Sequence, residues 1–191
     1  MTHYTGSLNP VFELERKELE SKIGHGFGNE AKKYDNIVPI LAFSKIEGIS
    51  LMKNELVKKL VQNVPLRKQK ILPYKNAEID FLNIDPRGIA IGQTFVLEDK
   101  LQTLWEKSPF EEYCVGMISK FPPLKVFGKH NEKKVMGIYL PPIVEVHGEY
   151  DILLDGMHRS YISKAAGTTI SALRVRGVSE KLPFRAIGWE S

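Results

Sequence analysis

A glycine turn between an apolar strand and a short helix is the feature that most constrains this chain. The strand covers residues 150–154, the turn covers residues 155–159, and the helix is predicted over residues 160–166. Glycine lets a backbone approach a ligand closely, and the first amides of a helix have no acceptor within that helix. Because the helix dipole adds positive charge at the same end, anions are attracted there. The pattern therefore indicates a site for a phosphate group or a nucleotide.

The residues predicted to bind the nucleotide lie in this turn or directly after it, and they are Gly156, Met157, His158, Arg159 and Ser160. Arg159 suits bidentate recognition of phosphate, and a surface salt bridge is its alternative role. His158 is expected to donate a hydrogen bond to a phosphate oxygen and to take part in catalysis. Ser160 either adds a hydroxyl contact or is an ordinary residue of the first helical turn.

A carboxylate, Asp155, stands directly before the glycine. Next to a phosphate site it would repel the ligand unless a cation lies between them, and Mg²⁺ held by a carboxylate and phosphate oxygens fits this need. Asp155 is therefore predicted to bind the metal and to be catalytic; its alternative role is to cap the helix. Two nearby glutamates, Glu145 and Glu149, are each either a general base or a solvated strand residue.

The elements around the turn follow a regular order. Residues 142–147 return through a turn as residues 150–154, which indicates a hairpin. Gly167 ends the helix, and residues 169–175 are predicted to form the next strand. Earlier in the chain, residues 79–84 alternate like a strand and lead into a turn.

This order of strand, turn, strand, glycine turn, helix and strand, with Asp-Gly-Met-His-Arg in the middle, resembles the ParB/sulfiredoxin superfamily over residues 138–178. The resemblance implies an α+β fold with a small mixed sheet and helices in residues 76–191, preceded by a basic N-terminal extension in residues 1–75. It also implies that a nucleotide binds at the turn. Superfamily members differ in activity: sulfiredoxins repair an oxidised cysteine with ATP, ParB proteins bind CTP and DNA, free serine kinases phosphorylate serine, and others are nucleases or ATPases.

The residue directly before His-Arg separates these activities. Sulfiredoxins place their catalytic cysteine there, whereas this chain has Met157, whose thioether cannot form a thiolate. Asp155 resembles the acidic residue of the serine kinases, although their second catalytic glutamate has no identified counterpart. We therefore expect an enzyme, a kinase or NTPase, that uses ATP, ADP or CTP with Mg²⁺ to transfer a phosphoryl group to a small molecule or to water. The alternatives are a DNA-binding or nuclease protein of plasmid or phage type and a nucleotide-sensing regulatory module.

Positive charge is concentrated in the first part of the chain. Residues 1–75 carry 13 Lys and Arg against 8 Asp and Glu, whereas residues 76–191 carry 14 against 15. Such a segment attracts nucleic acid, and the candidate contacts are Lys58, Lys59, Arg67 and Lys68. The alternative is a solvated helix face followed by a basic linker. No helix-turn-helix follows the ParB-like part, which argues against a full partition protein.

The remaining elements are predicted from periodicity and from turn residues. Helices are expected over residues 10–22, 53–63, 98–107 and 109–119, and strands over residues 37–43 and 124–127. Residues 24–29 are expected to form a mobile loop or, as the alternative, a lid that covers the substrate. Residues 128–134 are expected to form an exposed loop, and residues 181–189 a tail that packs back on the domain.

The single cysteine, Cys114, rules out an intramolecular disulfide and suits a reducing cytosol. No apolar run is long enough to cross a membrane, and the first residues lack the apolar core of a secretory signal. A cytoplasmic protein without a membrane partner is therefore expected.

Overall fold

The computed structural model describes residues 15–34, 36–64, 72–92, 96–99, 101–102 and 120–178. The chain divides into two units, which we call the N-terminal unit (residues 8–75 and 122–140) and the C-terminal unit (residues 76–121 and 141–191, with residues 1–7). Residues 122–140 thus group with the first part of the chain rather than with their sequence neighbours. The predicted helix over residues 109–119, Cys114 and the tail over residues 181–189 lie outside the described residues.

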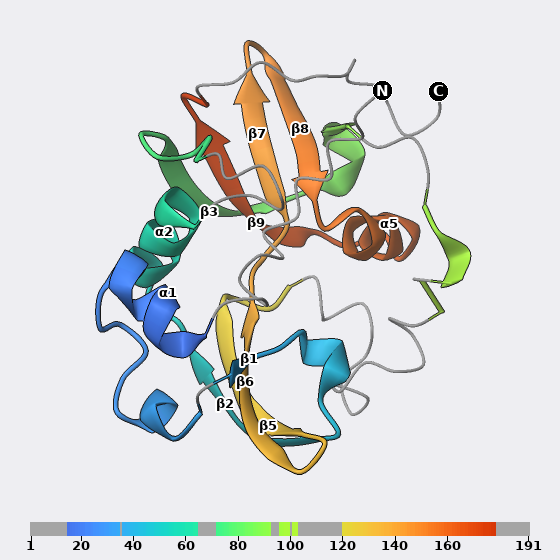
Figure 1. Cartoon of the computed structure of the whole chain (residues 1–191). Helices are drawn as coiled ribbons and strands as arrows, with labels where there is room; N and C mark the ends of the chain where they lie inside the picture. The colour runs from blue at the N-terminus through green and yellow to red at the C-terminus, as the bar shows by residue number, and fades with distance from the viewer. Residues whose placement is uncertain are drawn as a thin grey trace. The chain divides into compact units, whose positions relative to one another are not determined.

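The C-terminal unit contains a five-stranded mixed sheet with the strand order β3-β9-β7-β8-β4. Its strands are β3 (Glu78–Ile84), β4 (Ala90–Ile91), β7 (Ile143–His147), β8 (Tyr150–Asp155) and β9 (Ile170–Arg176). The predicted hairpin is confirmed: β7 and β8 are antiparallel neighbours, and Figure 1 draws them as adjacent arrows. β7 also pairs in parallel with β9, and β4 pairs in parallel with β8. The expected α+β class is confirmed.

One face of this sheet is apolar near the glycine turn and charged farther away. Val144, Leu153 and Ala172 pack together with Met157 at the start of helix α5 (Met157–Ala165), all at most 4% exposed. Farther along, Arg174 of β9 donates two hydrogen bonds to Asp151 of β8, at 3.0 and 2.8 Å. The apolar half of the sheet therefore fixes the first turn of α5 in the core.

The N-terminal unit contains a four-stranded sheet with the strand order β1-β6-β5-β2. Its strands are β1 (Asn36–Ile37), β2 (Lys45–Leu51), β5 (Leu124–His130) and β6 (Lys133–Tyr139). Its helices are α1 (Arg16–Ile23) and α2 (Asn54–Asn63), together with the 3₁₀ turns η2 (Glu30–Lys33) and η3 (Ile40–Ala42). Helices α1 and α2 pack against each other, as Figure 1 shows.

Helix α2 confirms the amphipathic helix expected over residues 53–63. Its buried residues repeat at helical spacing and are Leu56, Val57, Leu60 and Val61. Lys58 and Lys59 lie between them in sequence and are exposed. The 3.6-residue period was sufficient to place this helix because apolar and charged residues fall on opposite faces.

Two sequence predictions for the N-terminal unit were wrong. The strand expected over residues 37–43 is limited to β1, because Pro39 lacks an amide donor and the chain turns into η3 after it. The exposed loop expected over residues 128–134 is instead the end of β5, a turn at Asn131 and Glu132, and the start of β6. The lysine-rich sequence suggested a loop, but these lysines lie in strands at the end of a hairpin.

The turn between β5 and β6 places Glu132 in a strained backbone conformation. Asn131 and Glu132 have φ angles of +49° and +61°, as expected for a type I′ hairpin turn, in which glycine is favoured at the second position. A side chain in this left-handed region costs about 1 kcal/mol.

We expect Glu132→Gly to stabilise the protein by about 0.5–1 kcal/mol, because it removes this strain. The change also removes an exposed ion pair with Lys129, with a Nζ–Oε2 distance of 3.3 Å, which contributes little. Urea denaturation of the wild type and the variant measures the difference. Glu132→Ala, which loses the pair and keeps the positive φ, is the control, and the prediction is wrong if both variants have the same midpoint.

Candidate functional site

The glycine turn forms where β8 ends and α5 begins. Gly156 has φ +84° and ψ +22°, in the left-handed region, and precedes the first helical residue. A Cβ atom at this position would lie 2.7 Å from Cγ, 2.8 Å from Cβ and 3.0 Å from Cα of Pro142. Both the dihedral angle and the close approach therefore require glycine.

Helix α5 begins at Met157, three residues earlier than the sequence pattern indicated. The N–H of Ser160 donates to the carbonyl of Gly156 at 2.9 Å and closes the first turn. The amides of Met157, His158 and Arg159 consequently have no acceptor within the helix. The predicted residues are thus brought together in one helical turn, where the helix dipole favours an anion.

The side chain of Met157 is part of the core and is 4% exposed. It packs with Ile89, Leu153 and Ile170, among others. A ligand at the turn would therefore contact the backbone amide of Met157 and not its thioether. The position that holds a reactive thiol in sulfiredoxins is here a packing residue.

His158 has a partner that the sequence did not indicate. Its Nε2 accepts a hydrogen bond from the backbone N–H of Leu97 at 3.1 Å. The carbonyl of Leu97 in turn accepts from the N–H of Leu101 at 3.0 Å, so the imidazole holds the first residue of a helical turn. A neutral ring that accepts at Nε2 carries its proton on Nδ1, which is then a hydrogen-bond donor. Leu97 and His158 are 61 positions apart in sequence, so no local sequence pattern indicated this hydrogen bond.

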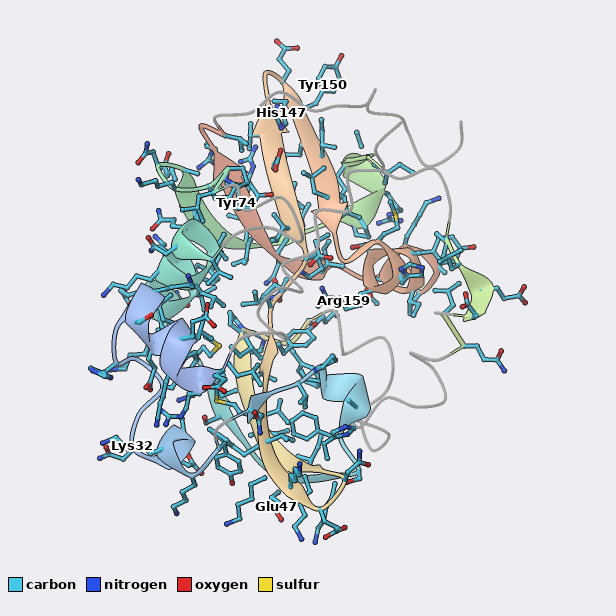
Figure 2. All side chains as sticks on the ribbon, viewed as in Figure 1. Lys32, Glu47, Tyr74, His147, Tyr150 and Arg159 are labelled. Carbon is cyan, nitrogen blue, oxygen red and sulfur yellow. The ribbon has the colours of Figure 1, made fainter. Side chains whose placement is uncertain are left out.

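Asp155 is the last residue of β8, opposite Ile143 in β7, and its side chain is half-buried. Arg159 is also half-buried and lies in the first turn of α5, where Figure 2 labels it. Within the described residues, no group of three or more His, Cys, Asp or Glu side chains could hold a metal ion. The donor set at the turn therefore fits Mg²⁺ only if the phosphates of a ligand supply further oxygens.

Ser160 is fully buried, and its hydroxyl has no hydrogen-bond partner in the described structure. Such buried polar atoms are uncommon in folded proteins and call for an explanation. A phosphate could reach this hydroxyl only if the residues that cover it moved. The predicted contact of Ser160 with a ligand remains a prediction.

A second charged element lies beside α5. The turn η4 (Pro86–Gly88) packs against the helix, and it carries Arg87, which forms a bidentate pair with Asp85. Arg87 Nε lies 2.9 Å from Oδ1 of Asp85, and Nη2 lies 2.6 Å from Oδ2. The side-chain hydrogen bonds from Arg87, with a backbone bond and its charge, lower the pKa of Asp85 to about 2. The guanidinium is thereby held in one orientation on the exposed surface.

The two glutamates of the hairpin differ from each other. Glu145 is 1% exposed and its Oε2 lies 2.6 Å from Nε2 of His147. Glu145 is therefore not the solvated strand residue that was one of its two predicted roles. Glu149 is exposed in the turn between β7 and β8.

The four candidate nucleic-acid contacts are only partly covered by the structure. Lys58 and Lys59 are exposed on α2, whereas Arg67 and Lys68 lie outside the described residues.

None of the helices in the described ranges is long and apolar enough to span a membrane.

Comparison with known proteins gives one match. The family model for the ParB CE domain matches residues 55–190, which is more than half of the chain. Searches of curated proteins and of solved structures gave no match.

Gly156→Ala should destabilise the protein by about 2–3 kcal/mol, because it combines left-handed strain with overlap on Pro142. Gly167 is a matched control: its φ is +64° and a Cβ there would meet nothing within 4 Å. Gly167→Ala should therefore cost only about 1 kcal/mol. Chemical denaturation of the two variants measures the difference, and equal losses would contradict the importance of the Pro142 contact.

Arg87→Ala should raise the pKa of Asp85 from about 2 toward its ordinary value of 3.8. A carboxyl NMR titration measures this shift directly, with Arg87→Lys as the variant that keeps the charge and loses the bidentate geometry. Since the folded pKa is depressed, any stability from the pair is present above pH 3.8 and is lost as pH falls through about 2. An unchanged pKa in Arg87→Ala would show that the pair does not form in solution.

Proposed function

The chain belongs to the ParB CE domain family, and we propose that it binds a nucleotide at the turn between β8 and α5 and catalyses Mg²⁺-dependent phosphoryl transfer or nucleotide hydrolysis. The observation that carries the proposal is the left-handed Gly156 at the first turn of a core-anchored helix. This turn directs several backbone amides and the dipole of α5 toward one place. The resemblance to the ParB/sulfiredoxin superfamily supports a nucleotide as the anion.

Recognition of the phosphates would be shared between backbone and side chains. The amides of Met157, His158 and Arg159 would donate to phosphate oxygens, and the guanidinium of Arg159 would add a charge-assisted bond. Nδ1 of His158 would provide a further donor while Nε2 keeps its bond to Leu97. Because Met157 is anchored in the core, the amides are held in place before the ligand arrives.

Asp155 would have a different role from the phosphate-binding groups. Its carboxylate lies next to the predicted phosphate position and would hold Mg²⁺ together with phosphate oxygens, or accept a proton from the attacking hydroxyl. Bound Mg²⁺ would offset the negative charge of the phosphates. ATP, ADP and CTP all fit this description, and the acceptor would be a small molecule with a hydroxyl group or water.

Arg159→Ala should weaken the binding of ATP or CTP in the presence of Mg²⁺ by about 10- to 100-fold, because a hydrogen bond from a charged donor is lost. Asp155→Asn should lower turnover much more than affinity. Isothermal titration calorimetry and a phosphate-release assay measure the two effects. Lys164→Ala, which removes a charge from the last turn of the same helix, is the control and should change neither.

The same calorimetry and phosphate-release assay distinguish the proposed enzyme from a protein that only binds a nucleotide. Tight binding without turnover in the wild type would make the protein a nucleotide-sensing module. If ATP, ADP and CTP all fail to bind with Mg²⁺ present, the proposed nucleotide site is wrong.

A further inference from the structure

Strand β2 lies at one end of the sheet of the N-terminal unit, and no strand among the described residues pairs with its outer edge. On its inner side β2 pairs antiparallel with β5, and the N–H of Met52 continues this ladder to the carbonyl of Pro123 at 2.9 Å. Successive residues of an antiparallel strand direct their N–H and C=O groups to alternate sides. The backbone groups of Ile49 and Leu51 therefore point away from β5, toward the outer edge.

The same part of β2 carries exposed aliphatic side chains. Ile49 is 43% exposed and Leu51 is 68% exposed. Proteins commonly protect the edge of a sheet with charged residues, which prevent pairing with another chain. Here the charged residues Glu47 and Lys53, both exposed, flank the aliphatic pair and do not interrupt it, and Figure 2 labels Glu47. The outer edge of β2 is thus suited to pairing with a further strand.

The side chains on this face form a pattern that is complementary to itself. Along the chain the pattern is acid, aliphatic, aliphatic and base, at Glu47, Ile49, Leu51 and Lys53, and Lys53 is still extended, with φ −68° and ψ +141°. When a second copy of the strand pairs antiparallel about Ser50, Ile49 lies opposite the second copy's Leu51, and Glu47 lies opposite its Lys53. These are favourable cross-strand pairs. The neighbouring registers, centred on Ile49 or on Leu51, put a charged residue opposite an aliphatic one.

The register about Ser50 also fits the backbone and a buried hydroxyl. Ile49 of each copy would exchange N–H···O=C hydrogen bonds with Leu51 of the other. Ser50 would lie on the twofold axis, opposite Ser50 of the second copy. Its Oγ is buried and has no hydrogen-bond partner in the described structure. Because hydroxyl groups directly opposite each other in antiparallel strands can form a hydrogen bond, pairing would satisfy this group.

We propose that two copies of this chain form a symmetric dimer in which their β2 strands pair antiparallel about Ser50 and join the two sheets into one. A twofold interface of this kind covers both outer edges at once and closes the assembly at two copies. At about 0.15 M salt, charges farther apart than about 8 Å are largely screened, so the net charge of +4 opposes association only weakly. The proposal concerns β2 alone and does not depend on the nucleotide site.

The test reverses the two flanking charges separately and together. Glu47→Lys should weaken the dimer by about 10- to 100-fold, because it puts like charges opposite each other at two symmetry-related places. Lys53→Glu should weaken it by a similar factor, and Glu47→Lys combined with Lys53→Glu should restore it. Lys45→Glu, a charge reversal in the same strand outside the paired residues, is the matched control and should change it much less. Sedimentation equilibrium from about 1 to 500 µM covers the range expected of a small interface.

Amide hydrogen exchange distinguishes the proposed pairing from any other self-association. The amides of Ile49 and Leu51 should exchange more slowly as the protein concentration rises, whereas the amide of Ser50, directed toward β5, should exchange slowly at every concentration. Because Glu47 and Lys53 are exposed, the dilute variants should melt at the same temperature as the wild type.

Three results would overturn the proposal. The first is a wild-type protein that stays monomeric at about 500 µM. The second is a double variant that is as weak a dimer as the single variants, since the register about Ser50 requires rescue. The third is exchange at Ile49 and Leu51 that does not depend on concentration.

Discussion

The contact between Gly156 and Pro142 determines how the site is built. Pro142 is held to the sheet because its carbonyl accepts a hydrogen bond from the N–H of Leu173 in β9 at 2.8 Å. Its ring then leaves room for only a hydrogen atom at position 156. Because Gly156 can adopt a left-handed conformation, the chain turns from β8 into α5 at this point, and Met157 fixes the new direction by packing into the core. The orientation of the helix amides follows from these contacts.

The sequence was most informative where local patterns determine structure. The hairpin, the strand β3, helix α2 and the glycine turn could be predicted because alternation, helical spacing and a glycine leave local signals. The start of α5 was misplaced by three residues, since its cap is a left-handed glycine rather than a side chain that accepts a hydrogen bond. The bond between His158 and Leu97 could not be predicted, because it joins segments that only the tertiary fold brings together.

Two strand glycines of the N-terminal unit mark a close approach between chain segments. Gly128 and Gly137 interrupt the apolar pattern of β5 and β6. A Cβ on Gly128 would overlap the carbonyl oxygen of Lys45, and a Cβ on Gly137 would lie 2.9 Å from Cγ1 of Ile40 and 3.0 Å from Cε2 of Phe43. A Cβ on Gly128 would lie 2.8 Å from Cδ1 of Phe43. Glycine in a strand often marks such a close approach, but sequence alone does not identify the side chain that fills the space. Gly128 and the lysines that follow it therefore made residues 128–134 resemble a loop.

The return of residues 122–140 to the N-terminal unit affects how the protein can be dissected. β5 pairs with β2 along its length and β6 pairs with the short strand β1 at Val135 and Met136, so both strands of this hairpin have a neighbour from the first 51 residues. A fragment that began at residue 76 would keep the hairpin and lose both neighbours. Unpaired strand edges of this kind promote aggregation. A fragment cut at residue 76 would thus be prone to aggregation. A fragment of the C-terminal unit that omits the hairpin and joins residue 121 directly to residue 141 would contain only residues of that unit.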